Sequence, residues 1–448
     1  MRSRRGRHFQ RLVVLLASLA SLARPGAAQT CLENPVRFST TDAEEGDAPF
    51  AVVTCDFDQD GNPDLATAND ASDTLSVLLN DGTGAFVARR RWSVGPPGVR
   101  SEPVDLACCD LNRDGLLDLV TANHTSDDIS VLFGEGLVEG TPRFSEAQRH
   151  PVGEAPWAVR CARINADDHL DLLIANFTDD NVAVLINDGA GGVDPAASYS
   201  IGVGDAPRAL AVCDLDTDGD LDVLTANLAG KSVSVLVNGG DSGLNDAGEI
   251  PLGVNPFGLA CGELDGIDGP DIVVANIVDD SITVLRNTGG GAFSGPARTG
   301  GVDGASNVIL VDADGDGALD VVSTNLGSDG ISILRNLGDG TLDAPLFITV
   351  GDNPSSAAAA GLVRGGGWDL VVAYADGVAV LANSCTSAGD LNEDGFRDLA
   401  DLAVFQTCMG EPSWKGPCPR ADLDSDGVIG LGDYAMLAPL LNGPCPFP

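Results

Sequence analysis

The most regular feature of the chain is a pattern of short apolar runs separated by polar turns. Runs rich in Val, Ile and Leu recur in sets of three, as at residues 50–54, 65–69 and 74–79, and again at 307–311, 321–325 and 331–334. Short runs of this kind between Asp, Asn and Gly clusters are typical of β-strands. The 3.6-residue period of an amphipathic helix is missing from this region. We therefore predict an all-β fold.

The pattern returns at a nearly constant interval. An aspartate at the end of a polar loop marks each copy, with spacings between 49 and 54 residues, at Asp64, Asp118, Asp171, Asp222, Asp271, Asp320 and Asp369. Seven copies at this period indicate a repeat architecture. A fourth, more polar strand follows each third apolar run. Four strands in about 50 residues are typical of a propeller blade, so we predict a seven-bladed β-propeller of four-stranded blades over residues 29–384.

The two ends of this region favour a closed ring. The seventh copy contains three strands, at 356–363, 369–373 and 378–381, but no fourth, and residues 36–41 form a spare strand at the start. Pairing the spare strand with 378–381 would remove a free sheet edge. Antiparallel pairing would also bring Cys31 beside Cys385, and we predict a disulfide between them.

The loop between the first two strands of each copy concentrates carboxylates at alternate positions. In residues 56–64 they occupy positions one, three, five and nine, with Gly61 at position six. Hard oxygen donors at this spacing suit Ca²⁺, whereas bare carboxylates so close would repel one another. The alternative, for a single copy, is a turn built from good turn formers. The predicted ligands of the four complete loops are Asp56, Asp58, Asp60 and Asp64; Asp110, Asn112, Asp114 and Asp118; Asp214, Asp216, Asp218 and Asp222; and Asp312, Asp314, Asp316 and Asp320.

The remaining three loops are degenerate. Arg163 takes the first ligand position of the third loop, so we expect that loop to bind calcium poorly or not at all. Ile267 takes the central position of the fifth loop, in which Glu263, Asp265 and Asp271 remain. The seventh loop keeps only its last carboxylate, and we expect it to bind no metal.

Charge and the first residues place the chain outside the cell. Residues 1–28 combine a basic start with an apolar run of 12 residues, which is typical of a signal peptide and too short to span a bilayer. The formal charge is −41, and −47 without those residues, so nucleic acid or an anionic membrane is a disfavoured partner. A soluble exported protein with no membrane insertion is expected.

Six cysteines lie at the ends of first strands, just before the loops: Cys55, Cys108, Cys109, Cys161, Cys213 and Cys261. Equivalent positions in neighbouring blades are not automatically within bonding distance. We interpret these cysteines as small buried side chains, with disulfides as the alternative.

The pattern changes after Cys385. Two acidic loops of twelve residues each precede an apolar helical stretch, and each loop has ligands at positions 1, 3, 5 and 12 with Gly at position 6. This is the EF-hand arrangement. We predict a small α-helical calcium-binding module over 385–448, with ligands Asp390, Asn392, Asp394, Asp401, Asp422, Asp424, Asp426 and Asp433. Cys408 and Cys418 flank the linker between its halves and form a second predicted disulfide.

The loops within their strand pattern resemble the FG-GAP or VCBS repeats of bacterial secreted proteins and of the integrin alpha-chain propeller. The resemblance covers residues 36–384 and implies that the metals rigidify one face while partners bind the opposite one. The turns between the second and third strands would lie on that opposite face: 69–73, 123–128, 176–181, 227–232 and 276–281. An Asn opens these turns in six of the seven copies, Tyr374 being the exception, and the alternative is that the Asn only shapes the turn.

The last 60 residues or so resemble a type I dockerin with its EF-hand-like duplicated loop. The resemblance implies attachment to a cohesin-like module. Positions ten and eleven of each loop, often hydroxyl residues in that family, are Leu399-Ala400 and Leu431-Gly432 here.

We therefore expect a secreted calcium-binding propeller that acts as a non-enzymatic interaction or adhesion scaffold for a protein or glycan ligand. The alternative is a polysaccharide-binding or polysaccharide-degrading propeller. His124, His150 and His169 occupy unrelated positions in the repeat, which gives catalysis little support. The chain has 4 Trp and 3 Tyr, so aromatic side chains on which a sugar ring could stack are scarce. Trp92 and Trp157 are the candidates for such sugar binding.

Overall fold

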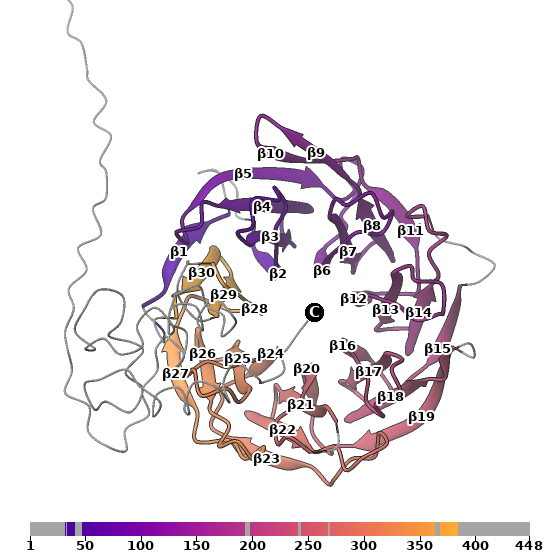
Figure 1. Cartoon of the computed structure of the whole chain (residues 1–448), viewed down its shortest axis with the longest axis vertical. Helices are drawn as coiled ribbons and strands as arrows, with labels where there is room; N and C mark the ends of the chain where they lie inside the picture. The colour runs from indigo at the N-terminus through magenta and orange to yellow at the C-terminus, as the bar shows by residue number, and fades with distance from the viewer. Residues whose placement is uncertain are drawn as a thin grey trace, which may run out of the picture. The chain divides into compact units, whose positions relative to one another are not determined.

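The computed structural model describes residues 32, 34–40, 47–192, 198–240, 243–267, 269–362 and 368–383, apart from the side chains of 87–89. Seven four-stranded antiparallel sheets stand around a common axis (Figure 1). The predicted all-β, seven-bladed propeller is confirmed. The signal peptide and the helical module over 385–448 lie outside the described residues.

Each blade runs from the axis outwards in chain order. Blade 1 contains β2 (Pro49–Cys55), β3 (Asp64–Asn69), β4 (Thr74–Asn80) and β5 (Phe86–Ser93); blade 2 contains β6 (Pro103–Cys109), β7 (Asp118–Asn123), β8 (Asp128–Leu132) and β11 (Gln148–Pro151); blade 3 contains β12 (Pro156–Ala162), β13 (Asp171–Asn176), β14 (Asn181–Leu185) and β15 (Tyr199–Gly202). Blade 4 contains β16 (Pro207–Cys213), β17 (Asp222–Asn227), β18 (Ser232–Asn238) and β19 (Leu244–Pro251); blade 5 contains β20 (Pro256–Gly262), β21 (Asp271–Asn276), β22 (Ser281–Leu285) and β23 (Ala297–Gly300); blade 6 contains β24 (Ala305–Val311), β25 (Asp320–Asn325), β26 (Gly330–Leu334) and β27 (Leu346–Thr349).

Blade 7 closes the ring with a strand from the other end of the region. It consists of β28 (Ser356–Ala360), β29 (Asp369–Tyr374), β30 (Gly377–Leu381) and β1 (Val36–Ser39). The antiparallel register places Val36 opposite Val380, and an isolated bridge joins Leu32 to Asn383. The predicted closure is therefore confirmed. Cys31 and Cys385, whose disulfide we predict, lie outside the described residues.

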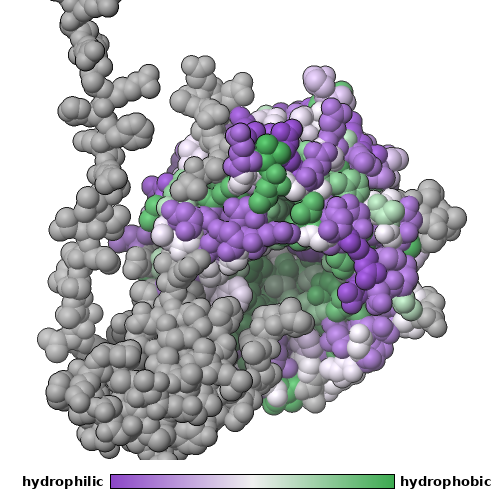
Figure 2. Space-filling model, turned by 45° about the horizontal axis from the view of Figure 1, so that its top comes forward, coloured by the Kyte–Doolittle hydropathy of each residue, from purple (hydrophilic) through white to green (hydrophobic). Residues whose placement is uncertain are grey.

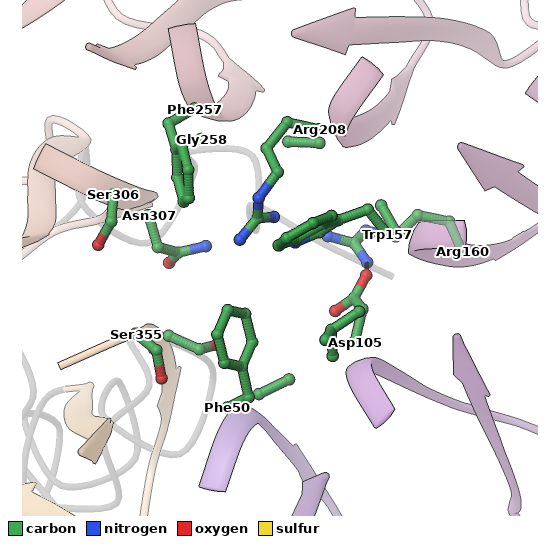
Figure 3. A pocket seen from close by; sticks show the side chains of 15 residues that line it. Phe50, Asp105, Trp157, Arg160, Arg208, Phe257, Gly258, Ser306, Asn307 and Ser355 are labelled. Atoms are coloured by element: carbon green, nitrogen blue, oxygen red, sulfur yellow. Dashed lines mark hydrogen bonds and ion pairs between the residues drawn. The ribbon is translucent and has the colours of Figure 1, made fainter. Parts of the chain in front are cut away.

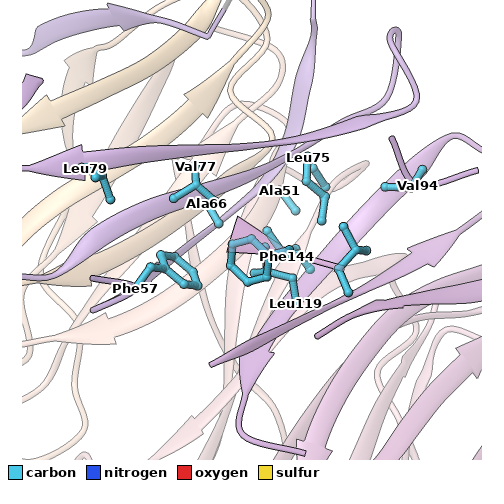
Figure 4. Close-up of a cluster of buried hydrophobic side chains, with 12 residues drawn as sticks. Ala51, Phe57, Ala66, Leu75, Val77, Leu79, Val94, Leu119 and Phe144 are labelled. Atoms are coloured by element: carbon cyan, nitrogen blue, oxygen red, sulfur yellow. The ribbon is translucent and has the colours of Figure 1, made fainter. Parts of the chain in front are cut away.

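The core lies between the blades. Every residue of a second strand such as β13 is buried, because neighbouring sheets cover both faces of that strand. This explains why these strands are almost continuously apolar between their terminal Asp and Asn. Outer strands such as β15 are mostly exposed and more polar. Figure 4 shows one such inter-blade cluster, in which Phe57 and Leu75 of the first blade pack with Leu119 of the second.

Blade 2 carries an extra hairpin that the repeat pattern did not predict. It consists of β9 (Gly134–Val138) and β10 (Thr141–Phe144), inserted between β8 and β11. Phe144 at its end packs edge-on against Phe57 and Trp92, with ring centroids 5.9 and 5.0 Å apart. The hairpin therefore completes the core between blades 1 and 2, and the partly buried Trp92 packs against this core.

The cysteine interpretation is wrong. Three disulfides join inner strands of neighbouring blades, with Cα atoms 6.6 to 6.9 Å apart: Cys55 to Cys108, Cys109 to Cys161, and Cys213 to Cys261. Inner strands pack side by side around the axis, so equivalent positions do meet. Cys108 and Cys109 are consecutive and point to opposite faces of β6, which lets one strand be bonded on both sides.

The disulfides indicate an oxidising compartment, as for an extracellular or secreted protein. Among the residues that the structure describes, no helix is long and apolar enough to cross a membrane.

Candidate functional site

The acidic loop of blade 1 is a tight turn held by its own carboxylates. Asp56 accepts hydrogen bonds from the backbone N–H groups of Asp60 and Gly61 at 3.1 and 2.9 Å, and Asp58 accepts one from Asp60 at 3.2 Å. Gly61 has a φ of 86°, a conformation that favours glycine. The Asp56 side chain, at the first ligand position, thus holds the loop in a tight turn through these backbone hydrogen bonds. The carboxylates of the loop converge on one side of the turn.

Four loops bring three carboxylates together so that one oxygen of each lies within 4.8 Å of the others. The sets are Asp56, Asp58 and Asp64; Asp214, Asp216 and Asp218; Glu263, Asp265 and Asp271; and Asp312, Asp314 and Asp316. Their all-oxygen chemistry is that of a hard divalent cation. The blade 5 set is among them although Ile267 takes its central position.

The loop of blade 2 has the same fold with one amide in place of a carboxylate. Asp110 accepts from the N–H groups of Asp114 and Gly115 at 3.1 and 3.0 Å, and the Asn112 amide oxygen accepts from Asp114 at 3.1 Å. In blade 3 Arg163 replaces the aspartate at the first ligand position. Short-range hydrogen bonds remain in this loop, in which Asn165 accepts from the Asp167 N–H and Asp167 accepts from the His169 N–H. The predicted ligands from Asp390 to Asp433 lie outside the described residues.

The ninth aspartate of every loop has a structural role that the sequence analysis did not anticipate. Its side chain is fully buried in all seven blades. In blade 1 the two oxygens of Asp64 accept from the N–H groups of Phe57 and Asn80 at 2.9 and 2.8 Å. Asp369 does the same for Leu362 and Asn383 at 2.8 and 2.7 Å. This explains why blade 7 keeps its ninth aspartate although the other acids are gone.

In six of the seven blades an asparagine at or just after the end of the third strand ties the blade to its predecessor, and in blade 2 Gly134 takes its place. The Asn187 amide donates to the carbonyl of Leu111 in the preceding blade at 2.8 Å, and Asn287 donates to Leu215 at 2.8 Å. Asn80 uses the same bond to connect blade 1 with Leu362 of blade 7, at 3.0 Å. The acidic loops therefore sit on the joints between blades, where a bound cation would stiffen the ring.

Burial raises the pKa of the ninth aspartates of blades 1 to 6. Desolvation is the largest cause, opposed by the two backbone hydrogen bonds and reinforced by the neighbouring carboxylates. The pKa reaches about 7 for Asp64 and Asp320 and about 6 for Asp118 and Asp271.

These shifts predict an unusual pH dependence for the metal-free protein. The folded state binds protons more tightly than the unfolded chain, so stability falls as pH rises from about 4 to about 7. In chelator, we expect a higher melting temperature at pH 5 than at pH 8. Calcium at pH 8 should remove this difference, since a cation stabilises the ionised carboxylates. Differential scanning calorimetry at both pH values measures it, and a chelated protein that melts higher at pH 8 would contradict the assignment.

A second site lies on the axis at the opposite ends of the inner strands. The residue after the opening proline, or its equivalent, lines a small pocket in every blade: Phe50, Val104, Trp157, Arg208, Phe257, Ser306 and Ser355 (Figure 3). In blades 1 to 6 the strand pairing shifts register at this position. A bulge re-aims the side chain of the extra residue, which explains why these side chains reach the axis.

Arg208 is the centre of this pocket. Its guanidinium carbon lies 4.2 Å from the ring centroid of Trp157 and 4.1 Å from that of Phe257, so two rings sandwich the cation. Desolvation lowers the pKa of Arg208 to about 9, against the opposing influence of the Asp105 charge, so the side chain stays protonated at neutral pH. In Figure 2 the part of the surface that is not grey shows hydrophilic side chains around a hollow with hydrophobic walls.

Of the residues that line this pocket, only Trp157 is singled out by the sequence pattern as a candidate for binding. A comparison of the residue after each Val-Gly-x-x-Pro segment could have found it, because only that position varies between aromatic, cationic and hydroxyl side chains. The turn asparagines that we considered instead are buried. Asn69 donates to Thr74 and Ser76 at 3.1 and 2.9 Å, so it shapes its turn. The histidines lie on different elements, and His124 packs against Trp157 with centroids 4.3 Å apart.

The fold defines a class of repeat propellers with an acidic loop between the first two strands of the blade, and a comparison with known families matches a repeat of this kind. The FG-GAP-like repeat model matches residues 56–121, 110–174, 163–225 and 264–323, which together span just over half of the chain. The chain therefore belongs to the FG-GAP-like repeat family. No curated protein matches it significantly.

Solved structures of low identity share the fold. Virginiamycin B lyase from Staphylococcus aureus aligns with a TM-score of 0.54 at 12% identity, over 79% of this chain and 98% of that one. A putative 6-phosphogluconolactonase from Bacteroides fragilis gives 0.51 at 15% identity, over 69% and 86% of the two chains. BBS1N in complex with ARL6DN gives 0.56 at 13%, over 81% and 99%.

Proposed function

We propose that this protein is a secreted, calcium-stabilised interaction scaffold whose propeller presents a ligand-binding face. The observation that carries the proposal is the convergence of carboxylates in loops at the blade joints. Calcium there would stiffen the ring, and weak calcium sites fill where the ion is plentiful, as outside cells. The three disulfides support the same location.

The ligand face would be the one opposite the loops. The inner strands begin at the axial pocket and end at the acidic loops, so stabilisation and recognition would use opposite ends of the same strands. The names of two structural neighbours denote a lyase and a lactonase, but at this identity the likeness concerns the fold alone. We propose binding rather than catalysis, in line with the scattered histidines.

Attachment is the second part of the proposal. Residues 385–448, with ligands from Asp390 to Asp433, would form a dockerin-like calcium module that anchors the propeller to a cohesin-like partner. The support for this part is the spacing of the two acidic loops.

Calcium titration by calorimetry tests the proposal. We expect the metal-free full chain to bind one calcium ion in each of the loops of blades 1, 2, 4 and 6. The double variant Asp314→Asn with Asp316→Asn should lose one site. Asp352→Asn is the matched control, because this exposed carboxylate lies outside the cluster. An unchanged site number in the double variant, or no calcium uptake by the wild type, would refute the calcium sites.

A further inference from the structure

The axial pocket contains a cation without a partner. Among the described residues, no carboxylate lies within ion-pairing distance of Arg208, and its buried Nε–H donates no hydrogen bond. The nearest acid, Asp105, is already engaged, because its Oδ2 accepts from the Val159 N–H at 2.9 Å and from Arg160 Nη1 at 2.6 Å. Arg208 is partly buried and its Nε is fully buried, and leaving such a charge unpaired is costly, so the pocket suits an anion.

A second donor faces the same space. The Oδ1 atom of Asn307 accepts from the N–H of Ala357 at 3.3 Å, which fixes the amide orientation and leaves its NH₂ group on the pocket side (Figure 3). The serines of the ring are already used, since Ser306 donates to Thr324 and Ser355 to the carbonyl of Pro49. Arg208, Asn307 and the indole N–H of Trp157 are therefore among the donors that the described residues leave for a ligand.

The volume of the cavity and the charge around it limit the kind of anion that the pocket can bind. The cavity has a volume of about 40 Å³, room for about three water molecules, and so for one small oxyanion group. With Asp105 neutralised by Arg160, Arg208 contributes a single positive charge. The chain as a whole carries −41, which repels polyanions such as nucleic acid.

We propose that the axial pocket binds one carboxylate group between Arg208 and Asn307, carried by a singly charged organic acid. The rings of Trp157 and Phe257 hold the guanidinium between them, so its free edge can form a bidentate hydrogen bond to a carboxylate. The proposal rests on the proposed function, since it supplies the chemistry of the ligand-binding face.

The test compares acids with neutral molecules of similar shape. NMR titrations of the calcium-loaded full chain would use acetate against acetamide and glucuronate against glucose, at constant ionic strength. We expect each acid to bind at least about tenfold more tightly than its neutral partner, as for a hydrogen-bonded charge. Binding of acetate alone identifies a small free acid as the source. Binding of glucuronate but not acetate identifies an acidic sugar.

Variants assign the effect to the pocket. Arg208→Gln should abolish the preference for the acids, and Asn307→Leu, which keeps the cation, should weaken it several-fold. Arg100→Gln is the matched control: it removes one positive charge from an exposed ion pair with Asp70 and Glu102, and should change nothing. Equal binding of acids and neutral partners by the wild type would overturn the proposal even if Arg208→Gln failed to fold. That outcome would leave the calcium titration, and with it the proposed scaffold, intact.

Discussion

Chelation of calcium should lower the melting temperature of the full chain by about 10 °C or more. A ligand that binds only the folded state adds about 2.7 kcal/mol per site at a hundredfold excess over its dissociation constant, and four loops would add several times that amount. The effect should be large here because each loop sits at a joint between blades. Without the cation, the loop carboxylates repel one another and the chain carries its full acidic charge.

The measurement is a thermal melt in excess chelator, with calcium added back as the first control. Variants separate the propeller loops from the acidic loops of residues 385–448. Asp58→Asn combined with Asp314→Asn should reduce the calcium-dependent part of the shift, whereas Asp352→Asn should not. A melt that is insensitive to chelator would mean that the carboxylate clusters do not bind calcium under these conditions.

Asp369→Ala should destabilise the propeller by about 2–5 kcal/mol, independently of calcium. Both oxygens of this fully buried carboxylate accept backbone hydrogen bonds, from Leu362 and Asn383. Removing them leaves two buried donors unsatisfied. The loss falls in blade 7, the blade that closes the ring, and its loop lacks the other carboxylates, so calcium cannot compensate.

Denaturant unfolding of the full chain measures this loss. Asp369→Asn should cost less, since the amide keeps one acceptor, and the exposed Asp352→Ala should stay within about 0.5 kcal/mol of the wild type. Asp64→Ala provides the comparison with a complete loop, and its cost should grow when calcium is present. If Asp369→Ala were as stable as the wild type, the ninth aspartate would not be the structural element that its hydrogen bonds indicate.

The two roles of the acidic loop explain its uneven degeneration. The ninth carboxylate supports the strand ends of its own blade, so it persists in all seven copies. The carboxylates at positions one, three and five serve only the loop, so blade 7 can lose all three, and blade 3 the first, without losing the blade. Counting carboxylates along the sequence does not distinguish the structural role of the ninth position from the proposed metal-binding role of the other positions. The hydrogen bonds in the structure do distinguish them.

The periodic apolar pattern was enough to predict the number of blades, the order of their strands and the closure through residues 36–39, because these depend on local alternation and on the repeat count. Three other features could not be predicted in the same way. These are the disulfides of Cys108 and Cys109 to different neighbouring blades, the packing of Phe144 into the core between blades 1 and 2, and the position of Arg208 on the axis. Each depends on residues about 50 or more positions apart in the sequence that come into contact only when the blades pack side by side. The sequence of a single repeat does not determine which side chains of the neighbouring blade contact it.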